Sequence, residues 1–193
     1  VGEKGYLDGI DISREEFYTK LPTFSEHPTT AVPSIERFRA AYNTLADEGA
    51  SEVISIHISK ALSAIMDVAT LAADQTTAIK VAVLDSHQLS LGTGFLVETA
   101  AKMAAAGHSL VDIMSKLKAQ ILHTHVFAAL DTVEFLKRSG RMNKYLAGFA
   151  GLLQIKPILT MFNGKPDTEK VRTRDRAIKR VVQMLAAVGK LER

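Results

Sequence analysis

The sequence predicts an α/β fold, with an N-terminal domain built on a parallel sheet with helices on both faces and an α+β C-terminal domain. Two observations predict this class. Helical segments and apolar strand segments alternate through the first half with short connections, which is typical of parallel α/β proteins. In the second half a hairpin pattern replaces this alternation. We therefore expect domains at 1–118 and 119–193.

The first two helices are predicted from their N-terminal signals. Ser13 followed by Glu16 is a capping box, which predicts a short helix through about Leu21. Pro33 can occupy the first turn of the second helix. Apolar residues at helical spacing give this second helix one buried stripe. The stripe consists of Ile35, Phe38, Tyr42 and Leu45.

Two short apolar runs predict neighbouring parallel strands. Residues 53–58 are rich in β-branched side chains, and residues 79–84 form a nearly continuous apolar run, as in strands covered on both faces. A one-sided apolar helix lies between them, and an Ala-rich helix follows from Gly92 to Ala106. Two parallel strands make too little sheet to stand alone. We therefore expect the first strand of this domain upstream of Val1, in a chain that is truncated.

The second half begins with a helix that Ser109 caps, followed by a strand within 121–130. Asp131 with Glu134 forms another capping box, which predicts a helix ending near Lys137.

A β-hairpin and a final helix complete the second half. The segments 155–162 and 165–173 flank an Asn-Gly pair, which suits the two positive φ angles of a tight hairpin turn. The last helix runs from about Arg174 to Val188. Its inward residues are expected to be Ile178, Val181, Val182 and Leu185.

Composition excludes several classes of protein. The 193 residues contain 47% apolar residues, 5 Pro and no Cys, which excludes a disordered chain, a disulfide scaffold and thiol catalysis. No apolar run approaches the roughly 20 residues of a membrane helix, so we expect no membrane insertion. The 24 basic residues exceed the 21 acidic ones by only 3, which is too few to indicate nucleic-acid binding without a localised patch.

Hydroxyl side chains gather where ligands bind in open parallel sheets, beyond the carboxyl ends of the strands and at helix N-termini. Several hydroxyls beside free helix N–H groups could hold a carboxylate or phosphate. Simple helix capping is the alternative for each residue taken singly. The set consists of Thr29, Thr30, Ser34, Ser59, Ser63, Ser86 and Ser90, together with Lys60 and Asp85.

Other kinds of site find weaker support. Gly92-Thr93-Gly94 opens a helix, but Val97 breaks the dinucleotide-binding fingerprint. His123 and His125 share a strand face without a third ligand at a suitable spacing, so no metal site is expected.

Catalytic and nucleic-acid sites are no better supported. Asp85, Ser86 and His87 are adjacent on one extended segment and cannot form a catalytic triad among themselves. The basic stretch from Lys165 to Arg180 is either a solvated helix face or a functional surface, for docking or for contact with an anion.

Seven segments together resemble the DegV family, in family order and over almost the whole chain. They are YLDGIDISREEFY near the start, PTTAVPS at 28–34, ISKALSAIMDVA at 58–69, VLDSHQLSLGTG at 83–94, LDTVEFLKRSGRM at 130–142, LLQIKPIL at 152–159 and EKVRTRDRAIKRV near the end.

The resemblance implies a bacterial, cytoplasmic protein that binds a long-chain fatty acid in an apolar tunnel, with the carboxylate held by hydroxyls at the domain junction. It implies no catalysis by this chain itself, which would present the fatty acid to a fatty acid kinase catalytic subunit that makes acyl phosphate. It implies no cofactor besides the bound fatty acid, no metal and no nucleic acid. Family members have more chain at both ends, so the C-terminal domain is expected to be incomplete.

The resemblance also implies site residues. Thr30 matches the family's head-group threonine and Ser63 its head-group serine, and we add Thr29, Ser59 and Ser86 as further ligand-binding candidates. The family usually has Thr-Ser-Gln-Pro-Ser where this chain has Thr-Ala-Val-Pro-Ser, so polar neighbours of the head group become apolar here.

A buried carboxylate also needs a cation nearby, because removing a charge from water without a counter-charge is costly. Arg172 closes the second hairpin strand in a segment that matches the family, and it is the first candidate. Arg141, after Gly140, is the second. Two alternatives to fatty acid binding stay open: an enzyme that uses the same hydroxyl nest as a phosphate or oxyanion site, and a basic module that binds nucleic acid.

Overall fold

The computed structural model describes residues 4–140 and 155–191. The chain divides into two compact units, 1–31 and 32–193. The first unit contains helix α1 (Arg14–Lys20), followed by the 3₁₀ helix η1 (Leu21–Thr23). The Ser13 Oγ accepts the Glu16 N–H at 3.1 Å, so α1 begins at the predicted cap.

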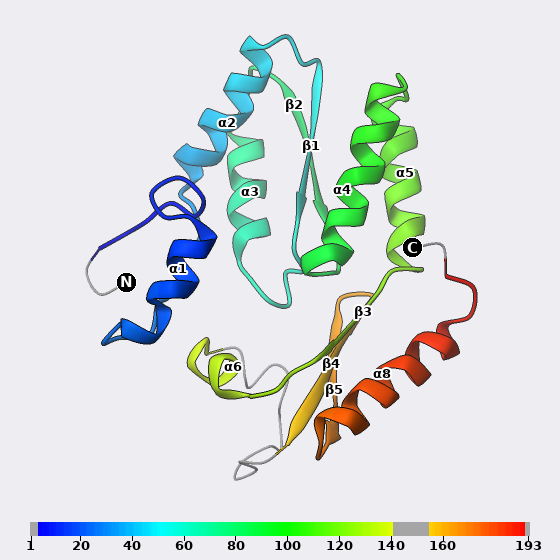
Figure 1. Cartoon of the computed structure of the whole chain (residues 1–193). Coiled ribbons are helices and arrows are strands. Elements are labelled where there is room, and N and C mark those ends of the chain that lie inside the picture. The colour runs from blue at the N-terminus through cyan, green and yellow to red at the C-terminus, as the bar shows by residue number, and fades with distance from the viewer. Residues whose placement is uncertain (1–3, 141–154, 192–193) are drawn as a thin grey trace. The chain divides into compact units, whose positions relative to one another are not determined.

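The second unit begins with a layer of helices on each face of a parallel pair of strands, β1 (Glu52–His57) and β2 (Lys80–Asp85) (Figure 1). The register pairs Glu52 with Lys80 and His57 with Asp85, which confirms the predicted parallel neighbours. Helices α2 (Ile35–Asp47) and α3 (Ile65–Asp74) cover one face, and α4 (Ser90–Ala105) and α5 (Leu110–Ile121) cover the other.

Each face of the parallel pair has its own apolar core. On the α4–α5 side, Leu84 packs with helix residues that include Leu96 and Leu117, both fully buried. On the α2–α3 side, Tyr42 and Ala72 pack with Ile79. Alternate residues of each strand point to opposite faces, so one strand supplies both cores.

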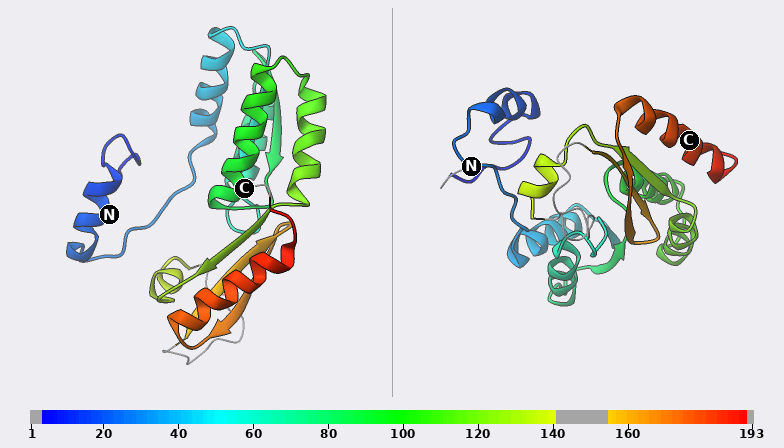
Figure 2. Two further views of the ribbon diagram at one scale, coloured as in Figure 1. Left: turned by 45° about the vertical axis from the view of Figure 1, so that its right-hand side comes forward. Right: turned by 90° about the horizontal axis from the view of Figure 1, so that it is seen from below.

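The second sheet of this unit is antiparallel, in the order β3-β4-β5. Its strands are β3 (His125–Ala129), β4 (Lys156–Phe162) and β5 (Lys165–Val171), with the short helix α6 (Glu134–Arg138) after β3. Asn163 and Gly164 join β4 to β5 with φ angles of 45° and 75°, as the predicted Asn-Gly turn requires. Helix α8 (Arg174–Val188) lies across one face of this sheet (Figures 1 and 2).

The predicted inward face of α8 is wrong at three positions. Ile178, Val182 and Leu185 are 50%, 59% and 37% exposed, whereas Ala177 is fully buried. The side chain of Arg180 reaches the Glu169 carboxylate of β5, at 2.7 Å from Nε to Oε1. This ion pair and the small Ala177 side chain bring a neighbouring stripe of the helix to the sheet.

Two predicted helix starts also differ from the structure. Pro33 precedes α2 instead of occupying its first turn, and Ser34 is the cap residue. Asp131 does not cap α6, because its carboxylate faces Lys156 and Arg174 at 3.8 and 3.9 Å. No helix in the described ranges has the length and apolarity needed to cross a bilayer. The domain boundary near residue 119 and the missing chain upstream of Val1 stay predictions.

Candidate functional site

A solvent-open pocket of about 470 Å³ lies at the carboxyl edge of the parallel sheet. The loops that follow β1 and β2 form one side, and the turn between β4 and β5 forms the other. Helix α3 contributes one residue. The lining residues are Ser59, Lys60, Ala61, Asp67, Asp85, His87, Asn163 and Gly164.

Asp85, at the end of β2, is the acidic centre of this pocket. Its side chain is only 8% exposed. One carboxylate oxygen accepts the His87 N–H at 2.8 Å, and the other accepts the Lys60 N–H at 3.3 Å. These bonds fold the two strand-end loops toward each other, so both contribute walls to the pocket.

Ser59, which lines the pocket, and Ser86, which follows Asp85, are both buried, and their hydroxyls form hydrogen bonds within the protein. The Ser59 Oγ accepts the Ala61 N–H at 3.3 Å. The Ser86 Oγ lies 2.9 Å from the Thr93 hydroxyl and accepts the Gln88 N–H at 3.1 Å. In this structure both serines stabilise the loops, and their role as ligand-binding residues stays a prediction.

Gln88 is a buried residue at this edge that the sequence analysis did not identify. Its Nε2 donates to the carbonyl oxygen of Thr124 at 2.6 Å, which ties the end of the parallel sheet to the start of β3. Gly92, in the first turn of α4, allows Val126 to approach closely on the same side. A long-range contact of this kind has no signal in local sequence pattern.

The two residues predicted to hold the head group lie in different units. Ser63 is half-buried just before α3, where its Oγ accepts the Ile65 N–H at 3.2 Å, and it is not among the residues lining the pocket. Thr29 and Thr30 are both exposed, in the first unit. The joint action of Thr30 and Ser63 stays a prediction.

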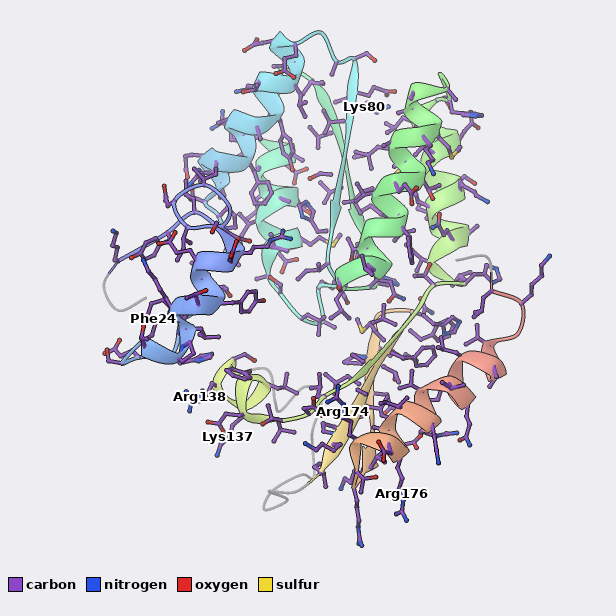
Figure 3. All side chains as sticks on the ribbon, viewed as in Figure 1. Phe24, Lys80, Lys137, Arg138, Arg174 and Arg176 are labelled. Carbon is purple, nitrogen blue, oxygen red and sulfur yellow. The ribbon has the colours of Figure 1, made fainter. Side chains whose placement is uncertain are left out.

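The first candidate cation, Arg172, is not among the residues that line the pocket. Arg172 is exposed directly after β5, so the length of that strand, roughly 20 Å, separates it from the Asn163–Gly164 turn. Arg141 lies outside the described residues. Arg174 and Arg176 belong to the first turn of α8, and both are exposed (Figure 3).

A polar chain runs behind the pocket, between β1 and α2. The Tyr42 hydroxyl lies 2.8 Å from the Ser55 Oγ, which lies 2.7 Å from His57 Nε2. The ring of Phe38 packs edge-on against His57, at 5.5 Å between centroids. Burial lowers the pKa of His57, and the negative charge of Asp85 partly opposes this effect.

His123 and His125 are stacking and surface residues in the structure, with no third metal-binding side chain near them among the described residues. The ring of His125 stacks on Phe162 with 4.3 Å between centroids. Burial lowers the pKa of His125, and the neighbouring His123 adds to this effect.

The family model described as "Uncharacterised protein, DegV family" matches residues 1–192. The chain belongs to the DegV family. A DegV domain-containing protein of Clostridium acetobutylicum is 33% identical over 190 residues, which cover 97% of this chain and 67% of that protein. A second DegV domain-containing protein, of Listeria monocytogenes, is 34% identical over 184 residues, which cover 94% of this chain and 65% of that protein. The chain thus spans about two thirds of the length of these relatives.

Solved DegV structures share this fold. DegV of Bacillus subtilis, described as a fatty acid binding protein, matches with a TM-score of 0.84 at 32% identity, over 95% of this chain and 65% of that one. A DegV family protein of Thermus thermophilus, described by its fatty acid binding, matches with 0.81 at 33% identity and the same coverage. A stearic acid-binding protein of Eubacterium ventriosum matches with 0.85 at 26% identity, over 97% and 66%. The predicted family and fold class are confirmed.

Proposed function

We propose that this protein binds a long-chain fatty acid and performs no chemistry on it alone. The similarity of its fold to fatty-acid-binding members of its own family carries this proposal. The composition agrees with it, because the chain has no Cys for thiol catalysis.

The carboxylate head group, in this proposal, binds to the hydroxyls of Thr30 and Ser63. Their match to the family motif supports both residues, and the half-buried position of Ser63 before α3 supports it further, because helix N-termini favour anions. Thr29 stands next to Thr30 in the same exposed loop. Ser59 and Ser86 would have to exchange their present hydrogen bonds to take part.

Calorimetric titration of the whole chain with stearate tests this proposal. A charge-assisted hydrogen bond contributes about 1.5–3 kcal/mol, so Ser63→Ala should weaken binding roughly tenfold or more. Thr30→Ala should do the same. Ser115→Ala, on the exposed side of α5, is the matched control and should bind as the parent does. If the parent does not bind stearate, the proposed function is wrong; if the double variant binds as the parent does, the head group lies elsewhere.

We propose further that the bound fatty acid is presented to a fatty acid kinase catalytic subunit. A carboxylate held by hydroxyl groups can leave an oxygen free for transfer of the ATP γ-phosphoryl group. The assay is acyl phosphate formation with stearate, ATP and the kinase subunit, with and without this protein. Formation that needs both proteins agrees with the proposal, whereas turnover by this chain alone would favour the enzyme alternative.

A further inference from the structure

The turn of the β4–β5 hairpin meets the carboxyl edge of the parallel sheet at His87. The Gly164 N–H donates to the His87 carbonyl oxygen at 3.0 Å. The His87 Nδ1 lies 3.1 Å from Asn163 Oδ1. On the other side, His87 Nε2 lies 3.6 Å from Asp85 Oδ2. The imidazole therefore stands between an amide of the hairpin and a carboxylate of the parallel sheet.

The backbone at this joint adopts uncommon conformations. His87, Ser90 and Asn163 are the non-glycine residues with positive φ in the described part of the chain, at 53°, 50° and 45°. The tight turn accounts for Asn163, but His87 adopts this conformation only because its surroundings hold it there. A Cβ at Gly164 would lie 3.3 Å from His87 Cγ, so glycine at this turn permits the close approach.

The protonation state of the His87 ring determines whether it can interact favourably with Asn163 and Asp85 at the same time. To donate to Asn163 Oδ1, the Nδ1 atom must carry the proton. A neutral ring then presents the bare Nε2 lone pair to the Asp85 carboxylate, which is unfavourable. The imidazolium carries a proton on both nitrogens, so its Nδ1 can donate to Asn163 Oδ1 while the positive ring forms an ion pair with the Asp85 carboxylate, 3.6 Å from Nε2.

The charged groups that face His87 come from the elements that line the pocket. Asp85 belongs to β2, Asp67 to α3 and Lys60 to the loop after β1, whereas the hairpin contributes the neutral Asn163. Lys60 bonds Asp85 through its backbone N–H. Among the described residues, His87 is the one basic side chain within ion-pair distance of the Asp85 carboxylate.

We propose that His87 is a proton-dependent latch between the two sheets of this unit. The imidazolium bridges Asp85 and Asn163 and holds the hairpin turn against the carboxyl edge of the parallel sheet. The neutral ring interacts favourably with only one of the two, so the hairpin turn separates from the parallel sheet more often and the pocket widens. This latch does not depend on the proposed fatty acid binding.

The test follows the Gly164 amide, whose hydrogen bond to His87 reports the closed joint. Its hydrogen-exchange protection factor, corrected for intrinsic exchange, is measured by NMR on the full chain at about pH 5.5 and about pH 8. The Ser86 amide, which bonds the His57 carbonyl oxygen inside the parallel sheet, is the internal reference. We expect Gly164 protection to fall roughly tenfold at the higher pH, with Ser86 unchanged.

Three variants isolate His87 from the other titrating groups. His87→Gln and Asn163→Gly should each abolish the pH dependence, and glycine keeps the positive φ of the turn. His108→Gln, at an exposed loop position, is the matched control and should behave as the parent. If the Gly164 protection factor of the parent does not change with pH, the latch is overturned, and the Asn163 amide instead donates to a neutral ring. A dependence that persists in both joint variants would also overturn it.

Discussion

Replacing Gly92 by alanine should destabilise the protein, although alanine is the better helix former. An ideal Cβ at Gly92 would lie 2.8 Å from Val126 Cγ2 and 3.1 Å from Gln88 Oε1. Carbon atoms in favourable contact lie about 3.5–4.0 Å apart, so α4 and β3 must separate or Val126 must change rotamer. Overpacking of this kind costs about 1–3 kcal/mol, against about 1 kcal/mol gained from helix propensity. We expect a net loss of up to about 2 kcal/mol.

Gly94, two residues further along α4, is the matched control. It is exposed, and no described side chain or distant backbone atom lies within 4 Å of its Cβ position. Gly94→Ala should therefore stabilise by up to about 1 kcal/mol. The same Gly→Ala change at two positions of one helix is thus expected to alter the stability in opposite directions, because the surroundings of the two glycines differ.

Urea denaturation followed by circular dichroism measures both changes as shifts of the midpoint at constant m. The double variant Gly92→Ala/Val126→Ala removes the methyl group that clashes, so it should show a favourable coupling of about 1 kcal/mol relative to the sum of the single changes. If Gly92→Ala is as stable as Gly94→Ala, or if the coupling is zero, the packing of α4 against β3 described above is wrong.

Three further predictions concern side chains. Burial lowers the pKa of His57, so as the pH falls the unfolded chain binds a proton at this histidine before the folded chain does. The contribution of His57 to stability is therefore complete above the pKa of an unfolded histidine and is lost as the pH drops toward about 5. Urea midpoints between about pH 5 and 7.5 should vary less with pH in His57→Gln than in the parent, and an equal variation would contradict this. Tyr42→Phe should cost about 1 kcal/mol by losing a buried hydrogen bond, whereas Tyr18→Phe, at a site 68% exposed, should cost nothing measurable by the same assay. We expect Arg172→Ala to weaken stearate binding because a desolvated carboxylate favours a nearby cation, although Arg172 does not line the pocket beside Asp85. Arg172→Lys should partly restore the affinity and Arg176→Ala should not change it; parental affinity in both Arg172 variants would exclude Arg172 from the site.

The parallel pair and the hairpin were predictable because local signals determine them. The run at 79–84 is nearly continuously apolar, which is typical of a strand covered on both faces, and it forms most of β2 (Lys80–Asp85). The pair Asn163–Gly164 carries its own turn geometry and set the β4–β5 register. Neither feature needs knowledge of distant residues.

The seating of α8 was not predictable, because it depends on a partner in another element. Helical spacing identifies an apolar face that includes Ile178 and Val182, and both are exposed. The ion pair of Arg180 with Glu169 and the close contact of Ala177 select a different rotation. Such long-range pairings are absent from any periodicity of the helix itself.

Hydroxyls at the ends of parallel strands have two competing uses, and residue type does not distinguish them. A serine can hold a ligand, or it can satisfy the backbone of a loop that leaves the sheet. Ser86 follows the second course, with a fully buried hydroxyl bonded to Thr93. Ser63 accepts the Ile65 N–H and is half-buried, so its hydroxyl is partly accessible to solvent. The distinction rests on exposure, and it ranks Ser63 above Ser86 as a group that could reach a carboxylate.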